Sequence, residues 1–174
     1  MARKLKTKGP LRTLGVYPGA REMGYAVLEE GELVYFGVHT FKHRQPRRFL
    51  VTDGVKVVGE LINACKPQLV AIEKASAARS TRAPRLTVVI DKMKRAAHGH
   101  GRDVKTYPLG MIKEASTGSR AATRRDVADA MVMKYPFLTK YRETDELSGE
   151  KYWVNMLNAV AVARTGFHDM SGRQ

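Results

Sequence analysis

The chain has 174 residues, and its 31 Lys and Arg against 17 Asp and Glu give a formal net charge of +14. The length fits one domain with a core of its own, and a hydrophobic content of 43% is ordinary for a globular protein. One cysteine, Cys65, excludes an internal disulfide, and the sequence shows no apolar run long enough for a membrane span and no signal-peptide pattern.

The positive charge favours a polyanionic partner. Neutralisation of phosphates by Lys and Arg is the main sequence-independent source of affinity for nucleic acid. Because the basic residues are spread over loops and helices instead of one amphipathic helix, nucleic acid is favoured over an anionic membrane or an acidic protein. Residues 1–10 are expected to form a basic flexible arm that touches phosphates, with an organelle address as the alternative. We expect a cytoplasmic protein associated with the nucleoid or with a ribonucleoprotein.

The first part of the chain predicts a three-stranded antiparallel meander. Pro18-Gly19 turns the chain after the first strand, and Glu30-Gly31-Glu32 forms a tight hairpin between the second and third. The predicted strands cover residues 11–17, 24–29 and 33–41.

The second part alternates helices and strands. Apolar residues at helical spacing predict helices over 49–64 and 84–97, each followed by a short strand, at 69–73 and 104–107. The remaining predicted elements are helices over 108–115, 123–135 and 152–167, with an irregular polar segment over 137–150. A meander followed by strand–helix–strand crossovers implies an α/β fold, in which two parallel strands complete a five-stranded mixed sheet flanked by helices.

Several short motifs share their order and spacing with one protein family. Pro18-Gly19 precedes Gly24-Tyr25-Ala26-Val27, Leu69-Val70-Ala71-Ile72 leads into Glu73, and Asn158-Ala159-Val160-Ala161 lies in the last helix. Through these motifs the chain resembles the RuvC-type Holliday junction resolvases, of the ribonuclease H-like superfamily, over roughly residues 11–168. The resemblance implies a ribonuclease H-like domain over residues 11–170.

The resemblance also implies a metal site from which most acids are missing. The family carries Asp-Pro-Gly, a glutamate and usually Asp-x-x-Asp where this chain has Tyr17, Glu73, Asn155 and Asn158. Two-metal cleavage of a phosphodiester needs several converging carboxylates, whereas only Glu73 is charged here. Glu73 is therefore at most a weak metal ligand, and Mg²⁺ is expected as a cofactor only if the protein is an active enzyme. Tyr17 is expected to fill the retired pocket, with stacking on a base as the alternative.

Basic residues around this site are implied to meet the nucleic-acid backbone. In the family such residues lie beside the cleavage site, and an aromatic wedge after the glutamate stacks into the opened junction. This chain keeps the basic residues and has no aromatic side chain in the corresponding stretch, residues 74–78. The predicted nucleic-acid-binding residues are Lys74, Arg79, Arg82, Arg85, Lys113, Arg120 and Arg124.

The helix predicted over 84–97 bears on the oligomeric state. In the resolvases the corresponding helix pairs across a two-fold axis, so that its apolar stripe, which includes Ile90 and Met93, suggests a homodimer. The alternative is that the stripe is buried in the chain's own core.

Three functional hypotheses follow. The first is a RuvC-like protein that binds branched DNA or structured RNA and is nuclease-deficient. The second is an active Mg²⁺-dependent Holliday junction endonuclease with an atypical or mutated site. The third is a structural subunit whose basic surface is buried in a ribonucleoprotein particle.

Overall fold

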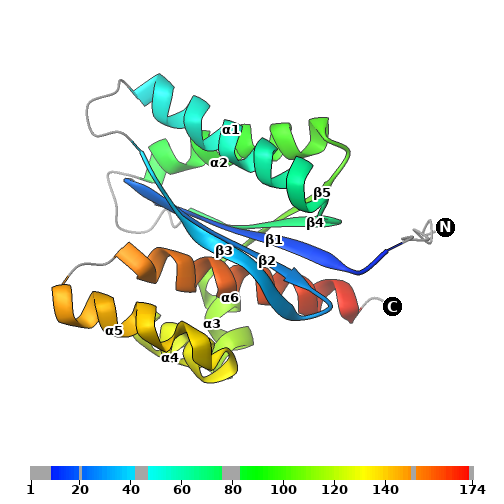
Figure 1. The fold of residues 1–174 in the computed structure, drawn as a ribbon. Coiled ribbons are helices and arrows are strands. Elements are labelled where there is room, and N and C mark those ends of the chain that lie inside the picture. The colour runs from blue at the N-terminus through cyan, green and yellow to red at the C-terminus, as the bar shows by residue number, and fades with distance from the viewer. Residues whose placement is uncertain (1–8, 20, 42–46, 76–82, 150–151, 173–174) are drawn as a thin grey trace.

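A computed structural model describes residues 9–19, 21–41, 47–75, 83–149 and 152–172, except the side chains of residues 47–50 and 83–85. The described chain forms one five-stranded sheet with helices on both faces (Figure 1). Its strands are β1 (Arg12–Pro18), β2 (Glu22–Glu29), β3 (Glu32–Thr40), β4 (Leu69–Glu73) and β5 (Asp103–Tyr107). Its helices are α1 (Arg47–Cys65), α2 (Ala83–Gly99), α3 (Leu109–Thr117), α4 (Arg124–Lys134), α5 (Thr139–Ser148) and α6 (Tyr152–Ser171), with a 3₁₀ turn, η1 (Pro136–Leu138).

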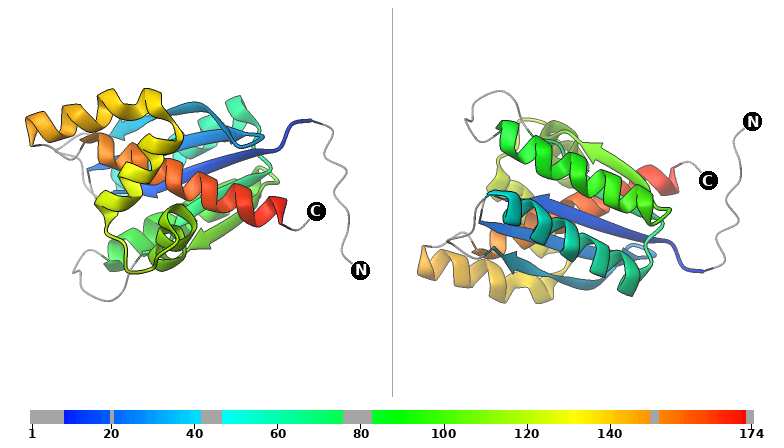
Figure 2. Two further views of the ribbon diagram at one scale, coloured as in Figure 1. Left: turned by 90° about the horizontal axis from the view of Figure 1, so that it is seen from below. Right: turned by 90° about the horizontal axis from the view of Figure 1, so that it is seen from above.

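The sheet has the mixed topology that the sequence predicts. The strand order is β3-β2-β1-β4-β5, in which the first three strands pair antiparallel and β4 and β5 join in parallel. Helices α1 and α2 cover one face, and α3 to α6 lie on the other (Figures 1 and 2). The α/β fold class with its three-stranded meander is therefore confirmed.

Helix α6 lies directly on the central strands. Gly15 of β1 and Gly24 of β2 face it, and a Cβ atom at either position would overlap the backbone of α6, at Ala159 and at Asn155 respectively. This contact holds α6 across the middle of the sheet (Figure 2, left). It also places the first turns of α6 over the ends of β1 and β2, where the candidate site lies.

The apolar stripe of α2 packs inside the chain. Ile90, Met93 and Ala97 are buried in the core between the sheet and helices α1 and α2, together with Leu14 and Ile72. The alternative of burial in the chain's own core therefore holds for these three residues of α2. The homodimer stays a prediction.

The prediction of an irregular segment over 137–150 is wrong, because most of this segment is helical. Its polar sequence shows no apolar period, and tertiary contacts stabilise it instead. Tyr141 of α5 packs on Trp153 with ring centroids 4.6 Å apart, and buried Asp145 accepts hydrogen bonds from the backbone N–H groups of Trp153 and Val154, at 3.0 and 2.7 Å. Asp145 thereby satisfies free N–H groups at the start of α6, where the helix dipole favours a carboxylate.

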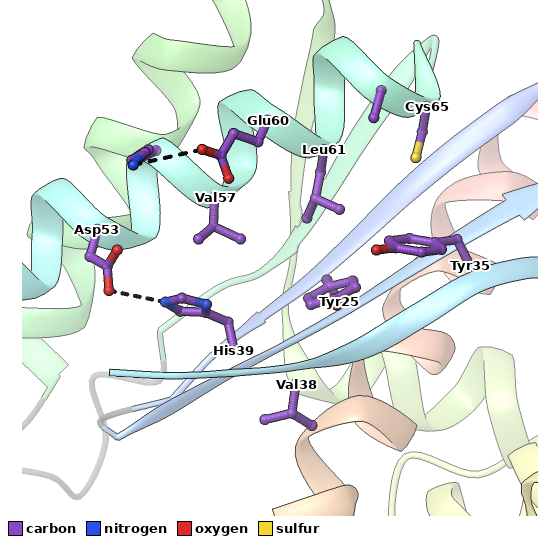
Figure 3. A pocket seen from close by; sticks show the side chains of 11 residues that line it. Tyr25, Tyr35, Val38, His39, Asp53, Val57, Glu60, Leu61 and Cys65 are labelled. Atoms are coloured by element: carbon purple, nitrogen blue, oxygen red, sulfur yellow. Dashed lines mark hydrogen bonds and ion pairs between the residues drawn. The ribbon is translucent and has the colours of Figure 1, made fainter. Parts of the chain in front are cut away.

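A groove of about 660 Å³ lies on the face of the sheet that α1 and α2 cover, between α1 and the outer strands β2 and β3 (Figure 3). Stacked Tyr25 and Tyr35 lie along it, a His39–Asp53 hydrogen bond of 3.0 Å lies toward one end, and Cys65 lies at the other. The groove is thus separated by the sheet from the polar residues under α6. Within the described residues, no helix is both long and apolar enough to cross a membrane.

The close approach of α6 gives a test of the packing. Gly15→Ala should lower the free energy of unfolding by roughly 2–3 kcal/mol or more, because the added methyl group meets backbone atoms that have no space to move. Gly110→Ala in α3 is the control, since no atom other than those of its chain neighbours and its own helix backbone lies within 4 Å of its Cβ position. The control should leave the stability unchanged or raise it by up to about 1 kcal/mol. Urea unfolding of both variants measures the difference, and equal stabilities would contradict the packing described.

Candidate functional site

The strand register brings Tyr17 and Glu73 together. Parallel strands β1 and β4 pair Val16 with Ile72, so the next residues are neighbours: Tyr17 is the last but one residue of β1, and Glu73 is the last residue of β4. Val16 and Ile72 point into the core on the α1 and α2 face. Because side chains alternate along a strand, Tyr17 and Glu73 point to the opposite face, toward α6.

Asn155 and Asn158 come to the same end of the sheet from α6. The Asn155 amide oxygen lies 3.8 Å from the Cβ position of Gly19, and Asn158, one turn further on, is buried. The structure therefore places the four site positions predicted from the sequence in one region. Asn155 donates a hydrogen bond from Nδ2 to the Glu22 carboxylate at 3.2 Å, so its side chain also contacts an acid on β2.

Glu73 is held by a guanidinium group. Arg124 donates from Nη2 to Glu73 Oε1 at 2.6 Å and from Nη1 to Glu73 Oε2 at 3.2 Å, so both carboxylate oxygens are engaged. The Glu73 side chain is 9% exposed, and the Arg124 side chain is 37% exposed. The Arg124 guanidinium carbon also lies 5.2 Å from the centroid of the Tyr17 ring. The space beside the only carboxylate among the four positions is thus filled by a cation and a phenol.

A capping box positions Arg124 at the start of α4. The hydroxyl of Thr123 accepts a hydrogen bond from the Asp126 backbone N–H at 3.1 Å, and the Asp126 carboxylate accepts one from the Thr123 N–H at 2.7 Å. Hydrogen bonds from the backbone and hydroxyl of Thr123 lower the pKa of Asp126, and the charges of Arg125 and Lys113 add to this. This motif fixes the first residue of the helix, Arg124, at the edge of the site.

The charge states of the site follow from burial and from the ion pair. Burial raises the pKa of the Tyr17 phenol; the charge of Arg124 lowers this pKa, and that of Glu73 raises it. Tyr17 is therefore neutral at physiological pH. Burial alone would lower the pKa of Arg124, but the hydrogen bond and the negative charge of Glu73 raise it above its usual value. Arg124 is thus a permanent cation, and it balances the single charge of Glu73.

These residues do not fit a divalent metal ion. Mg²⁺ relies on carboxylates and sheds its water reluctantly, and the carboxylate of Glu73 is already occupied by Arg124. Asp169, on α6, pairs instead with Lys105 at 2.6 Å and with the Tyr107 hydroxyl at 2.8 Å. Over the ranges that the structure describes, no three His, Cys, Asp or Glu side chains gather as a metal-binding group.

The predicted nucleic-acid-binding residues differ in their surroundings. Lys74 is exposed and directly follows Glu73, Lys113 on α3 is half-buried, and Arg120 pairs with Glu114 at 2.7 Å. Arg124 is engaged by Glu73, a contact that sequence reasoning missed. The signal available was that a lone acid among buried neighbours needs a counter-charge or several hydrogen-bond donors. Outside the described part of the chain lie Arg79, Arg82 and the side chain of Arg85.

A double-mutant cycle measures the ion pair. With Glu73→Gln and Arg124→Ala, singly and together, we expect a coupling of about 1–2 kcal/mol in the free energy of unfolding. The carboxylate is buried, but solvent screening reaches the guanidinium and limits the value. The Arg120–Glu114 pair has a similar distance of 2.7 Å with side chains 72% and 50% exposed, and should couple by less than about 0.5 kcal/mol. Equal couplings in the two cycles would contradict the described burial of Glu73.

Comparison with known proteins agrees with the fold. The family model described as crossover junction endodeoxyribonuclease RuvC matches residues 13–149. RuvC of Synechococcus sp. (strain WH7803) is 28% identical over 165 residues, which cover 90% of this chain and 98% of that protein. Two solved structures share the ribonuclease H-like fold: Thermus thermophilus RuvC (TM-score 0.72, 22% identity, 93% of this chain and 97% of that one) and the same protein with a Holliday junction substrate (0.69, 20%, 93% and 96%).

The yeast mitochondrial Holliday junction resolvase is a more distant structural neighbour. It aligns with a TM-score of 0.64 at 9% identity, over 89% of this chain and 77% of that one. The family match covers well over half of the sequence, and the structural matches extend over nearly all of it. The chain therefore belongs to the RuvC family of crossover junction endodeoxyribonucleases.

Proposed function

We propose that this RuvC-family protein binds nucleic acid and does not cut it. Branched DNA is the ligand that we favour. The observation that carries the proposal is the Glu73–Arg124 pair. Cleavage by two metal ions requires converging carboxylates, and here one carboxylate remains and its two oxygens are bound by a guanidinium. Tyr17, Asn155 and Asn158 contribute no charge.

Charge and family membership support the binding half of the proposal. The net charge of +14 favours a polyanion, and exposed Lys74 adjoins the site. The charge of Lys113 reaches Asp126 in the first turn of α4, and Arg120 lies four residues before that helix. A family member of known structure holds a Holliday junction substrate. We infer that residues 11–170 act as one domain and that the basic residues 1–10 add contacts to phosphates.

Binding should depend steeply on salt. Each neutralised duplex phosphate contributes about 0.9 to the slope of log affinity against log salt, so several contacts should give a slope of magnitude about 4 or more. Lys113→Ala should lower that magnitude by about 1. The control is Lys56→Ala, because Lys56 is exposed on α1, on the opposite face of the sheet, and should leave the slope unchanged. Fluorescence anisotropy with a labelled four-way junction measures all three proteins. A flat salt dependence, or no binding to DNA or RNA at low salt, would contradict the proposal.

No metal-dependent incision of a four-way junction is expected. Labelled junctions incubated with Mg²⁺ or Mn²⁺ should remain intact at protein concentrations that bind them fully. The triple change Tyr17→Asp, Asn155→Asp and Asn158→Asp restores the family's acids. Arg124 would still hydrogen-bond both oxygens of Glu73, so we expect cutting only when Arg124→Ala is added. Symmetric incision by the unchanged protein would establish the active-endonuclease alternative instead.

Preference for branched over duplex DNA should be modest. Base–aromatic stacking is worth about 1–3 kcal/mol per base, and the stretch after Glu73 offers no aromatic side chain to supply it. Competition binding at fixed salt compares a four-way junction with a duplex and an RNA hairpin of equal length. A junction preference of roughly several hundred-fold, far beyond what one lost stack explains, would contradict this expectation. Preference for the RNA hairpin would favour the ribonucleoprotein alternative.

A further inference from the structure

We propose that Arg124 is a built-in cation that takes the place of a divalent metal ion at this site, so that the protein binds phosphodiesters without any metal. The inference rests on the proposed nucleic-acid binding and adds how the site achieves it. Its starting point is the disagreement between the residues present and the metal that the family's name as a nuclease implies.

Arg124 fills the space and balances the charge beside Glu73. A metal ion bound to Glu73 would have to displace at least one of the two Arg124 hydrogen bonds, at 2.6 and 3.2 Å. Among the four positions it would then share one negative charge with the displaced guanidinium, because Tyr17, Asn155 and Asn158 are neutral, and the Glu22 carboxylate is hydrogen-bonded to Asn155. Two cations of total charge +3 beside one carboxylate repel each other strongly in a partly buried site. The ion pair therefore excludes the metal.

The Arg124 guanidinium is oriented by the Tyr17 ring. The Tyr17 ring lies beneath it, with the guanidinium carbon 5.2 Å from the ring centroid, a geometry that attracts a cation to an aromatic face. The substitution of an aspartate by a tyrosine thus has a defined role, because the phenol ring supports the cation that replaces the metal. The cap on α4 fixes the other end of the side chain.

The Arg124 guanidinium still has N–H donors for another partner. An arginine has five N–H donors, and the bonds to Glu73 use two of them. Within the described residues Glu73 is the only hydrogen-bond partner of this group, and the side chain is 37% exposed. Three N–H groups are therefore available to a phosphate oxygen, and planar guanidinium groups suit phosphates well. The same cation can neutralise Glu73 and hold the nucleic-acid backbone.

A protein-only experiment tests the exclusion of metal. Mn²⁺ is titrated at constant ionic strength and followed by electron paramagnetic resonance in the unchanged protein, Arg124→Ala and Arg125→Ala. Arg125 is the matched control, because it neighbours Arg124 on α4 and pairs with Glu146 instead of Glu73. Arg124→Ala should bind Mn²⁺ at least about ten-fold more tightly than the other two, and adding Glu73→Gln should abolish the gain. Equal Mn²⁺ affinity in all three proteins would overturn the inference.

Arg124→Gln provides the same comparison if the alanine variant does not fold, since it keeps an amide donor beside Glu73 and removes the charge. It should also gain Mn²⁺ affinity, and an affinity equal to that of the unchanged protein would count against the built-in cation.

A binding experiment tests the metal-free contact with nucleic acid. The affinity of the unchanged protein for a four-way junction should agree within about two-fold between EDTA and Mg²⁺ at matched ionic strength. In EDTA, Arg124→Ala should bind about five- to ten-fold more weakly, and Arg125→Ala at most about two-fold more weakly. A requirement for Mg²⁺, or equal losses in the two variants, would overturn the inference while the proposed function stands. If the unchanged protein binds no nucleic acid at all, the proposed function fails, and the Mn²⁺ titration still decides whether Arg124 excludes metal.

Discussion

A carboxylate buried at the end of a central strand needs a counter-cation, and this constraint determines the character of the site. Glu73 is 9% exposed, and an unpaired charge there would be costly. In a site with four acids, metal ions meet the same need. With Tyr17, Asn155 and Asn158 in place of acids, one arginine is enough, because the formal charges of Glu73 and Arg124 cancel. The loss of three carboxylates and the presence of Arg124 beside the fourth are therefore consistent parts of one arrangement.

The sheet and α6 form the scaffold that positions this ion pair. Glycines on β1 and β2 let α6 approach the strands closely, which brings Asn155 and Asn158 over the strand ends. The capping box of Thr123 and Asp126 starts α4 at the residue that must reach Glu73. Asp145 satisfies backbone donors at the start of α6 and so ties α5 to it. The fold of the family is thus retained, and the described site holds an ion pair between Glu73 and Arg124.

The sequence predicted most of this fold and only part of the site. The strands were identifiable because hydrophobic alternation, the turn at Pro18-Gly19 and the crossovers are local signals. The helix predicted over 123–135 begins at Thr123, which is the N-cap of α4 in the structure. Helix α5 was missed because its stability comes from Tyr141 and Asp145 reaching elements distant in sequence. The positions of Tyr17, Glu73, Asn155 and Asn158 came from a family resemblance. The pairing of Arg124 with Glu73 spans 51 residues and depends on side-chain direction, which no local pattern records.

We infer that a guanidinium, and no metal ion, neutralises Glu73. Crystals of the unchanged protein soaked in MnCl₂ test it most directly, through anomalous scattering measured near the manganese absorption edge. We expect no anomalous peak beside Glu73, and density for the Arg124 guanidinium between that carboxylate and the Tyr17 ring. A manganese peak bound to Glu73, with the Arg124 side chain turned away, would contradict it.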